Sequence, residues 1–239
     1  MSGQGTSFLQ AGYTFPKPLI DIGGKPMIQL VIENLTPRTQ HLFILIPKKE
    51  HFDKFSLHQI FSNTAKGNFT ALPQLATTQG AACSVLSAVD YINNDSELII
   101  ANADQIIDIS IDKFIQFAMT SKANGVIMTF PSQHPRWSYA RVDKKGAVLE
   151  VAEKKVISDQ ATVGIYYFKK GSDFVKAAFV MISKNIRFNN DFYVCPVYNE
   201  MILAGKKIIN WEIKDSQMHG LGTPEDLNKY LRLLEKHKK

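Results

Sequence analysis

The residue types best suited to chemistry appear at the start of the chain, where Gly3 and Gly5 stand one residue apart and Lys17 follows between two prolines. Glycine has no Cβ, so the backbone amides of such a run can approach phosphate oxygens closely. The prolines stiffen the segment that carries Lys17, and a lysine fixed near phosphate stabilises the charge of phosphoryl transfer. The spacing predicts a phosphate-binding loop, with an ordinary loop as the open alternative.

A carboxylate that could hold a metal ion follows an apolar run. The segment ELIIANAD (97–104) has the composition of a strand and ends in Asp104. Ligands of open α/β sheets bind beyond the carboxyl ends of the strands, and magnesium prefers oxygen ligands such as carboxylates. The position therefore favours metal binding by Asp104 over the alternative, a loop-capping role.

Alternating apolar runs and helical periodicities supply the elements that must position these residues. We predict a hairpin over 139–154, helices over 25–35, 52–61, 79–92, 110–123, 173–182, 194–205 and 222–237, and strands over 41–47, 68–75, 97–104, 125–131, 161–168 and 206–213. The alternation of strands and helices predicts an α/β fold with a doubly wound, mixed but mainly parallel sheet. The hairpin begins a C-terminal antiparallel extension. No flexible linker is apparent, so we expect a single domain over 1–239.

The composition excludes several classes of protein. The chain of 239 residues has no apolar run of the roughly 18–20 residues that a membrane span needs. The two cysteines, Cys83 and Cys195, lie far apart and favour a reducing, cytoplasmic location. The net charge of +6 suits anionic small substrates, with a merely basic surface as the alternative. No basic stripe is interleaved with aromatic residues, so we expect no nucleic-acid partner; a homo-oligomer is left open.

Taken together, the G-x-G run, the P-K-P-L segment and GKPMI (24–28) resemble the signature of sugar-phosphate nucleotidylyltransferases. These are enzymes of the Rossmann-like GT-A type that couple an NTP to a sugar 1-phosphate and release pyrophosphate. The resemblance continues through TTQGAACSVLSA (77–88), IIANADQIID (99–108), VLEVAEKKVIS (148–158), ATVGIYYF (161–168) and GLGTPEDLNKY (220–230). Two further runs, AGYTFPKPLIDIGGKPM and FYVCPVYNEMI, look most similar to a subgroup of capsule and lipopolysaccharide biosynthesis that is also labelled family-2-glycosyltransferase-like.

This resemblance implies a role for each candidate residue. Residues 1–137 would form a nucleotide-binding half and residues 138–239 a sugar-binding half. Asp104 would bind Mg²⁺ and act in catalysis with Lys17. The nucleotide-binding residues would be Gly3, Gln4, Gly5, Gln79 and Gly80, and the residues that bind the sugar phosphate would be Glu153, Lys154 and Gly164. On the residues themselves, Glu153 and Lys154 could equally be an exposed charge pair in a hairpin.

The sequence departs from the family pattern in three places. Ser7 stands where the family usually has an arginine, and serine supplies neither positive charge nor a bidentate contact. Gly220 stands where many members have an aspartate as a second metal ligand, so Asp104 would act without it or with help from Asp108. The family also has a hydrophobic strand directly before the glycine loop, and we expect this first strand to be missing ahead of Met1.

The leading hypothesis is therefore a magnesium-dependent nucleotidylyltransferase that makes a precursor of surface polysaccharide. A glycosyltransferase on the same architecture is the second hypothesis, but such enzymes usually carry a D-x-D motif, which NADQIID (102–108) lacks. A nucleotide-binding relative without turnover is the third, since Ser7 and Gly220 are uncharged. The sequence does not identify the base or the sugar.

Overall fold

The computed structural model of the chain describes residues 6–237. It divides into two compact units made of interleaved segments. Unit 1 comprises the chain up to Ala76, Asn102–Asp112 and the chain from Ser216 onward, and unit 2 comprises Thr77–Ala101 and Lys113–Asp215. Within the described residues, no helix has the length and apolar character needed to cross a membrane.

Unit 1 consists of short elements joined by tight turns. They are α1 (Thr6–Gln10), a 3₁₀ turn (Lys17–Leu19), β1 (Asp21–Ile22), β2 (Lys25–Pro26), α2 (Met27–Leu35), β3 (Phe43–Leu45), α3 (Lys49–Lys54), α4 (Leu57–Thr64), β4 (Phe69–Ala71), β6 (Gln105–Ile107), β12 (Met218–Gly220) and α10 (Pro224–His237). Strands β3 and β4 pair in parallel, whereas β1 with β2 and β6 with β12 are antiparallel. The pairing of β6 with β12 joins segments far apart in the sequence.

Helix α2 contributes to two apolar clusters of unit 1. Its buried residues, Met27, Ile28, Val31 and Ile32, recur at helical spacing. Two of them pack in a cluster that also contains Phe8, Ile20, Ile22, Ile106, Leu221 and Leu227. The other two pack in a cluster with Leu45, Leu57, Phe61 and Ala65. One amphipathic helix therefore ties the segment around β6 to the segment around β3.

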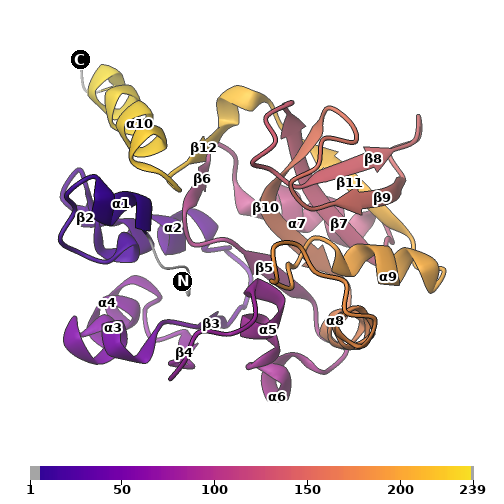
Figure 1. The fold of residues 1–239 in the computed structure, drawn as a ribbon, viewed down its shortest axis with the longest axis horizontal. Coiled ribbons are helices and arrows are strands. Elements are labelled where there is room, and N and C mark those ends of the chain that lie inside the picture. Colours follow the sequence, from indigo (N-terminus) through magenta and orange to yellow (C-terminus); the bar gives the residue numbers. More distant parts are fainter. Residues whose placement is uncertain (1–5, 238–239) are drawn as a thin grey trace. The chain divides into compact units, whose positions relative to one another are not determined.

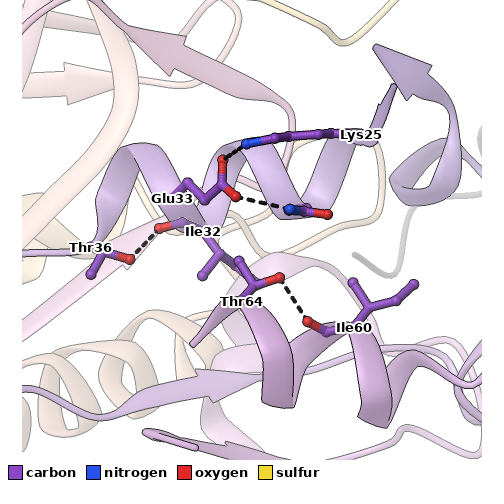
Figure 2. Close-up of polar contacts among 7 residues, drawn as sticks. Lys25, Ile32, Glu33, Thr36, Ile60 and Thr64 are labelled. Atoms are coloured by element: carbon purple, nitrogen blue, oxygen red, sulfur yellow. Dashed lines mark hydrogen bonds and ion pairs between the residues drawn. The ribbon is translucent and has the colours of Figure 1, made fainter. Parts of the chain in front are cut away.

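Polar contacts support the helices of unit 1 (Figure 2). Lys25 of β2 donates to the carboxylate of Glu33 in α2 at 2.8 Å. The hydroxyls of Thr36 and Thr64 each donate to the carbonyl four residues earlier, at 2.6 and 2.7 Å. These bonds satisfy carbonyls near the C-terminal ends of α2 and α4, where the helix itself provides few partners.

A six-stranded mixed sheet forms the centre of unit 2. Its strands are β5 (Leu98–Ala101), β7 (Gly125–Pro131), β8 (Tyr139–Val142), β9 (Val148–Ala152), β10 (Gln160–Phe168) and β11 (Ile208–Glu212). The order is β11-β7-β10-β8-β9, with β5 also paired to β10. Strand β11 is parallel to β7, whereas β10 is antiparallel to β5, β7 and β8. All nine residues of β10 are buried, which makes it the core strand of this unit.

The helices of unit 2 are α5 (Ala81–Leu86), α6 (Val89–Ile92), α7 (Ile111–Thr120, whose first two residues fall in unit 1), α8 (Gly171–Ser183) and α9 (Val197–Leu203). Helices α8 and α9 lie side by side, drawn in orange in Figure 1. Tyr198 of α9 stacks on Phe168 of β10 with 4.6 Å between ring centres, and its hydroxyl donates to the carbonyl of Tyr167 at 2.9 Å. This contact anchors α9 to the core strand.

The predicted α/β class with a mixed sheet is confirmed, but the balance of strand directions differs from the expected one. The two strands predicted over 97–104 and 125–131 are β5 and β7, and each pairs antiparallel with β10. They therefore run in the same direction with β10 between them, and β8 and β9 come between β7 and β10 in the sequence. The assignment of 1–137 and 138–239 to nucleotide and sugar, and the strand expected ahead of Met1, stay predictions.

Two predicted helices are each divided in two. The helix predicted over 52–61 is interrupted at Ser56, whose left-handed backbone (φ 49°) separates α3 from α4. The helix predicted over 79–92 is interrupted after α5, where the hydroxyl of Ser87 donates to the carbonyl of Ser84 at 2.7 Å. A serine whose hydroxyl bonds to the nearby backbone competes with continuation of the helix. The spacing of apolar residues does not show this competition, so it predicted one helix in each case.

Side chains cap the start of two helices, and a glycine caps the end of a third. The N–H of Asp112 donates to the hydroxyl of Ser110, and the N–H of Asp226 donates to the hydroxyl of Thr223, both at 3.2 Å. Gly205 adopts φ 75° just beyond α9, as a left-handed C-terminal cap requires.

Two asparagines, one in α2 and one in α9, each bond through the side chain to both backbone groups of one strand residue. The side chain of Asn34 in α2 donates to the carbonyl of Ile107 at 2.9 Å and accepts from its N–H at 3.0 Å. Asn199 in α9 bonds in the same way to Val151 of β9, at 2.9 and 2.8 Å. Backbone groups shielded from water need partners, so each asparagine replaces a neighbouring strand at one position.

We expect Asn34→Ala to lower the free energy of unfolding by about 1–3 kcal/mol, because both backbone groups of Ile107 lose their partner. Urea denaturation followed by circular dichroism measures the change. The control is Asn63→Ala, which removes an exposed contact with Gln59 and should change stability by less than about 0.5 kcal/mol. Equal effects of the two substitutions would contradict the role assigned to Asn34.

Candidate functional site

Lys17 and Asp104 meet in unit 1, although 87 positions separate them. The ammonium of Lys17 donates to Oδ2 of Asp104 and forms an ion pair with it. Both side chains are largely buried, with exposures of 24% and 28%. Pro16 and Pro18 hold the 3₁₀ turn in which Lys17 lies, and Asp104 directly precedes β6. A fixed cation and a fixed carboxylate are thus brought together just before the first residue of β6.

The segment after β12 borders this ion pair. The N–H of Leu221 donates to the carbonyl of Asp104 at 2.8 Å. A Cβ at Gly222 would lie 3.4 Å from Oδ2 of Asp104 and 3.8 Å from the ammonium of Lys17. Gly222 therefore leaves this side of the ion pair free of side-chain atoms, and a larger residue would contact both Asp104 and Lys17.

The donor set around Asp104 fits a magnesium ion that takes most of its ligands from substrate and water. Within residues 6–237, no group of three His, Cys, Asp or Glu side chains could hold a metal ion. Asp108, the candidate helper, contacts Nε2 of His219 at 2.7 Å. Magnesium is often bound by one or two carboxylates together with substrate phosphates. Asp104 can supply that carboxylate.

Positions 7 and 220, which depart from the family pattern, bring no charged group to unit 1. Ser7 lies exposed in α1, and Gly220 lies in β12 opposite Gln105. Neither position supplies the arginine or the second carboxylate that the resemblance implies. Three predicted nucleotide-binding residues, Gly3, Gln4 and Gly5, lie outside the described residues.

Gly80 lies in unit 2 where two backbone segments approach each other closely. Its φ is +103°, and a Cβ there would come within 2.5 Å of the backbone N and O of Phe192. The N–H of Phe192 donates to the carbonyl of Gln79 at 2.8 Å, and the N–H of Ala82 donates to the carbonyl of Phe192 at 2.9 Å. The side chain of Gln79 is exposed. This Gly80 turn (residues 79–82) is therefore fixed by backbone contacts with Phe192.

Glu153 is a largely buried carboxylate in unit 2. It accepts a hydrogen bond from the hydroxyl of Ser138 at 2.5 Å. Burial raises the pKa of Glu153, and the bond from Ser138 and the charge of Lys154 offset part of this increase. A carboxylate that has lost water gains from additional donors. Sugar hydroxyls are donors of this kind.

Lys154, the next residue, turns to a different set of partners. Its backbone is left-handed, with φ 49°. Its ammonium donates to the hydroxyl of Tyr193 at 2.9 Å and lies 4.7 Å from the centre of that ring and 5.5 Å from the ring of Phe188. Glu153 and Lys154 are thus not an isolated pair of exposed charges, because each has its own half-buried partner.

Gly164 lies at an irregularity in β10. Its φ is +87°, and the register of β10 against β7 shifts between Thr162 and Tyr166. The hydroxyls of Thr162 and Tyr166 are 2.9 Å apart. A glycine is needed here because a side chain at this φ would strain the strand. The backbone conformation explains the residue without reference to a ligand.

Three residues near the candidate site were not assigned from the sequence. Ser138 could have been found by continuing the hairpin register one step beyond the pair Tyr139–Ala152, which places it opposite Glu153. Gly222 lies in the GLGT run that marks the start of α10. Tyr193 is half-buried, and its hydroxyl accepts a hydrogen bond from Lys154.

Comparison with known proteins gives a family match over most of the chain. The family model described as nucleotidyl transferase matches residues 1–192. The bifunctional protein GlmU of Methanocaldococcus jannaschii is 26% identical over 157 residues, which is 65% of this chain and 35% of that protein. The chain therefore corresponds to about a third of the length of this curated relative.

Solved structures give the same fold over nearly the whole chain. The nucleoside-diphosphate-sugar pyrophosphorylase of Vibrio cholerae RC9 has a TM-score of 0.83 at 21% identity and covers 96% of this chain and 97% of its own. The inositol-1-phosphate CTP transferase of T. maritima has a TM-score of 0.77 at 13% identity, with coverages of 99% and 93%. At these identities the likeness shows the fold.

We expect Gly80→Ala to lower the free energy of unfolding by about 3 kcal/mol or more, since the Cβ would meet backbone atoms of Phe192 that cannot move independently. Gly205→Ala is the matched control in the same unit: its φ is +75° with nothing within 4 Å of the added Cβ. That substitution should cost about 1–2 kcal/mol, the strain of a left-handed residue. Chemical denaturation gives both values, and similar losses would contradict the close approach.

The raised pKa of Glu153 predicts a pH dependence of stability. The folded state holds a proton on this carboxyl at pH values where the unfolded chain, with its ordinary pKa of 4.5, has lost it. Ionisation therefore destabilises the fold increasingly as pH rises from about 4.5 through the raised pKa. We expect the stability of Glu153→Gln relative to the wild type to increase across this window and then level off. Urea denaturation at a series of pH values measures it; a constant difference would contradict the shift.

Proposed function

Because the chain belongs to the nucleotidyl transferase family, we propose that it couples a nucleoside triphosphate to a sugar 1-phosphate, or to a similar phosphorylated small molecule, and releases pyrophosphate. The name of the Vibrio cholerae relative supports a sugar acceptor. The name of the T. maritima relative, an inositol-1-phosphate CTP transferase, is the reason to keep other phosphorylated acceptors. The product would serve as a precursor of surface polysaccharide, made in the cytoplasm.

The contact between Lys17 and Asp104 is the observation that carries this proposal. A triphosphate brings several negative charges, and a metal ion that accompanies it needs a carboxylate. Lys17 and Asp104 offer one group for each requirement, in direct contact with each other. Magnesium, when bound, would offset the negative charge of the triphosphate.

The reaction needs no covalent intermediate on the protein. An oxygen of the acceptor phosphate would attack the α-phosphorus in line, a new P–O bond would form, and the bond to the β-phosphate would break as pyrophosphate leaves. Lys17 would stabilise the negative charge on the transferring and leaving phosphates from a position that its two prolines fix. The protein's contribution is therefore position and charge.

Residues of unit 2 would select the substrates. Lys154 would bind the acceptor phosphate, because its ammonium has donors left after the bond to Tyr193. Glu153 would accept hydrogen bonds from sugar hydroxyls. Gln79 and Gly80 would contact the nucleotide, and Gly164 would leave room near the sugar.

A nucleotide-binding relative without turnover is the second candidate. It is favoured by the two uncharged positions, Ser7 and Gly220. An arginine that stabilises transferring phosphate is worth about 10³–10⁵ in rate in phosphoryl-transfer enzymes that use one. The absence of such a charge at position 7 is therefore the strongest argument against turnover.

Pyrophosphate release decides between the two candidates. The wild type is assayed with ATP, GTP, CTP, UTP and dTTP against a panel of sugar 1-phosphates and inositol 1-phosphate, with magnesium. We expect release with one pair, and a loss of about 10²–10³ in kcat for Lys17→Met and for Asp104→Asn. Lys25→Met removes a more exposed ion pair of the same unit, with Glu33, and should keep the wild-type rate.

Two results would change the assignment. Binding of a triphosphate without release from any pair would support the relative without turnover. Wild-type kcat in Lys17→Met would contradict the role of that lysine while leaving the family's reaction in place.

A further inference from the structure

One short segment contacts both the turn assigned to the nucleotide and the lysine assigned to the acceptor phosphate. Phe192 exchanges backbone bonds with the Gly80 turn, and the next residue, Tyr193, receives the ammonium of Lys154. We propose that Tyr193 is a positioning residue that holds Lys154 in place for the acceptor phosphate, from a segment that the Gly80 turn fixes. This inference rests on the proposed function and adds a residue to it.

The hydrogen bond and the ring contacts of Lys154 orient its ammonium, and none of them is an ion pair. The hydroxyl of Tyr193 accepts one hydrogen bond at 2.9 Å, and the rings of Tyr193 and Phe188 lie 4.7 and 5.5 Å from the ammonium. In the part of the chain that the structure describes, no carboxylate forms an ion pair with Lys154. A carboxylate partner would compete with an incoming phosphate, whereas a phenol and two aromatic faces orient the ammonium and leave its positive charge available.

The segment that carries Tyr193 is braced from its other side. The guanidinium of Arg187 lies 4.1 Å from the ring centre of Phe192 and donates to Asn185 and to the carbonyl of Asn190, at 2.5 and 3.1 Å. Phe188 and Asp191 exchange two backbone hydrogen bonds at 3.0 Å. The loop 185–193, which we call the aromatic loop, is thus a closed turn with its own internal bonds.

The Gly80 turn fixes the end of the aromatic loop. A Cβ at Gly80 would approach the backbone of Phe192 to 2.5 Å, so the two backbones are in direct contact. Tyr193 follows Phe192 without an intervening residue. The backbone position from which Tyr193 reaches Lys154 is therefore fixed by the contacts of Phe192.

The alternative is that Tyr193 fills space. A filling role predicts that the ring matters and the hydroxyl does not, since phenylalanine keeps the ring. The half-exposed position of Tyr193 and the bond from its hydroxyl to Lys154 argue for the positioning role. The substitution Tyr193→Phe separates these two roles because it removes the hydroxyl and keeps the ring.

The first test is kinetic and uses the substrate pair found by pyrophosphate release. We expect Tyr193→Phe to raise KM for the acceptor phosphate by about 10-fold, with KM for the triphosphate changed by less than about 2-fold. Tyr91→Phe removes a hydroxyl from an exposed tyrosine of the same unit and is the matched control. An unchanged acceptor KM in Tyr193→Phe would overturn the proposal.

A double-mutant cycle tests whether Tyr193 acts through Lys154. Lys154→Met should raise KM for the acceptor phosphate by at least as much as Tyr193→Phe. In the Lys154→Met background, the further substitution Tyr193→Phe should have no effect on that KM. Independent, multiplying effects would overturn the positioning role.

A second readout needs no enzymatic activity. Acetic anhydride labels lysines, and mass spectrometry compares Lys154 with its exposed neighbour Lys155 as an internal reference. We expect Tyr193→Phe to raise the labelling of Lys154 relative to Lys155 by about 3-fold or more, because the ammonium loses the bond that holds it, and Tyr91→Phe to leave the ratio unchanged. A wild type without pyrophosphate release would refute the proposed function, while an unchanged labelling ratio in Tyr193→Phe would refute the contact itself.

Discussion

Backbone groups on strands need hydrogen-bond partners, and this requirement helps to fix one candidate acidic residue in each unit. Ile107 lies three residues after Asp104, and Val151 lies two residues before Glu153; each receives both of its bonds from an asparagine side chain on a helix. Helix packing therefore sets the position of the strand, and the strand sets the position of the carboxylate. Within each unit the chemistry depends on an amide that itself contacts no candidate site residue.

The two candidate lysines illustrate different solutions to the same electrostatic problem. Lys17 is largely buried and is paired with a carboxylate, so a phosphate that approaches it must compete with Asp104. Lys154 is held by a phenol and aromatic rings rather than by an ion pair with a carboxylate. The first arrangement suits a site that receives a metal ion together with an anion, because the metal takes the carboxylate as the anion takes the lysine. The second suits a site for an anion that arrives without a metal ion.

Local patterns predicted the elements well, and long-range contacts limited the rest. The strand 125–131 coincides with β7, and the caps at Ser110 and Thr223 follow from side chains next to the helix start. The position of β10 between β5 and β7 does not follow from any local pattern, since it depends on pairing between distant segments. Lys17 and Asp104 could each be predicted as candidates from the sequence, but their ion pair could not, because 87 positions separate them. The contact of Tyr193 with Lys154 could not be predicted either, because it depends on the fold of the aromatic loop.

Two of the departures from the family pattern, at positions 7 and 220, change the charge of unit 1 in opposite directions. Serine at position 7 removes a positive charge relative to the pattern, and glycine at position 220 removes a negative one, both within unit 1. The net charge of that unit is the same as with both groups present, so its attraction for a metal–triphosphate complex of given charge is little altered at long range. What changes is the number of direct ligands. Under the proposed function, Lys17 would be left for the triphosphate and Asp104 for the metal among the candidate residues that the structure describes. In the structure the two residues are each other's partner.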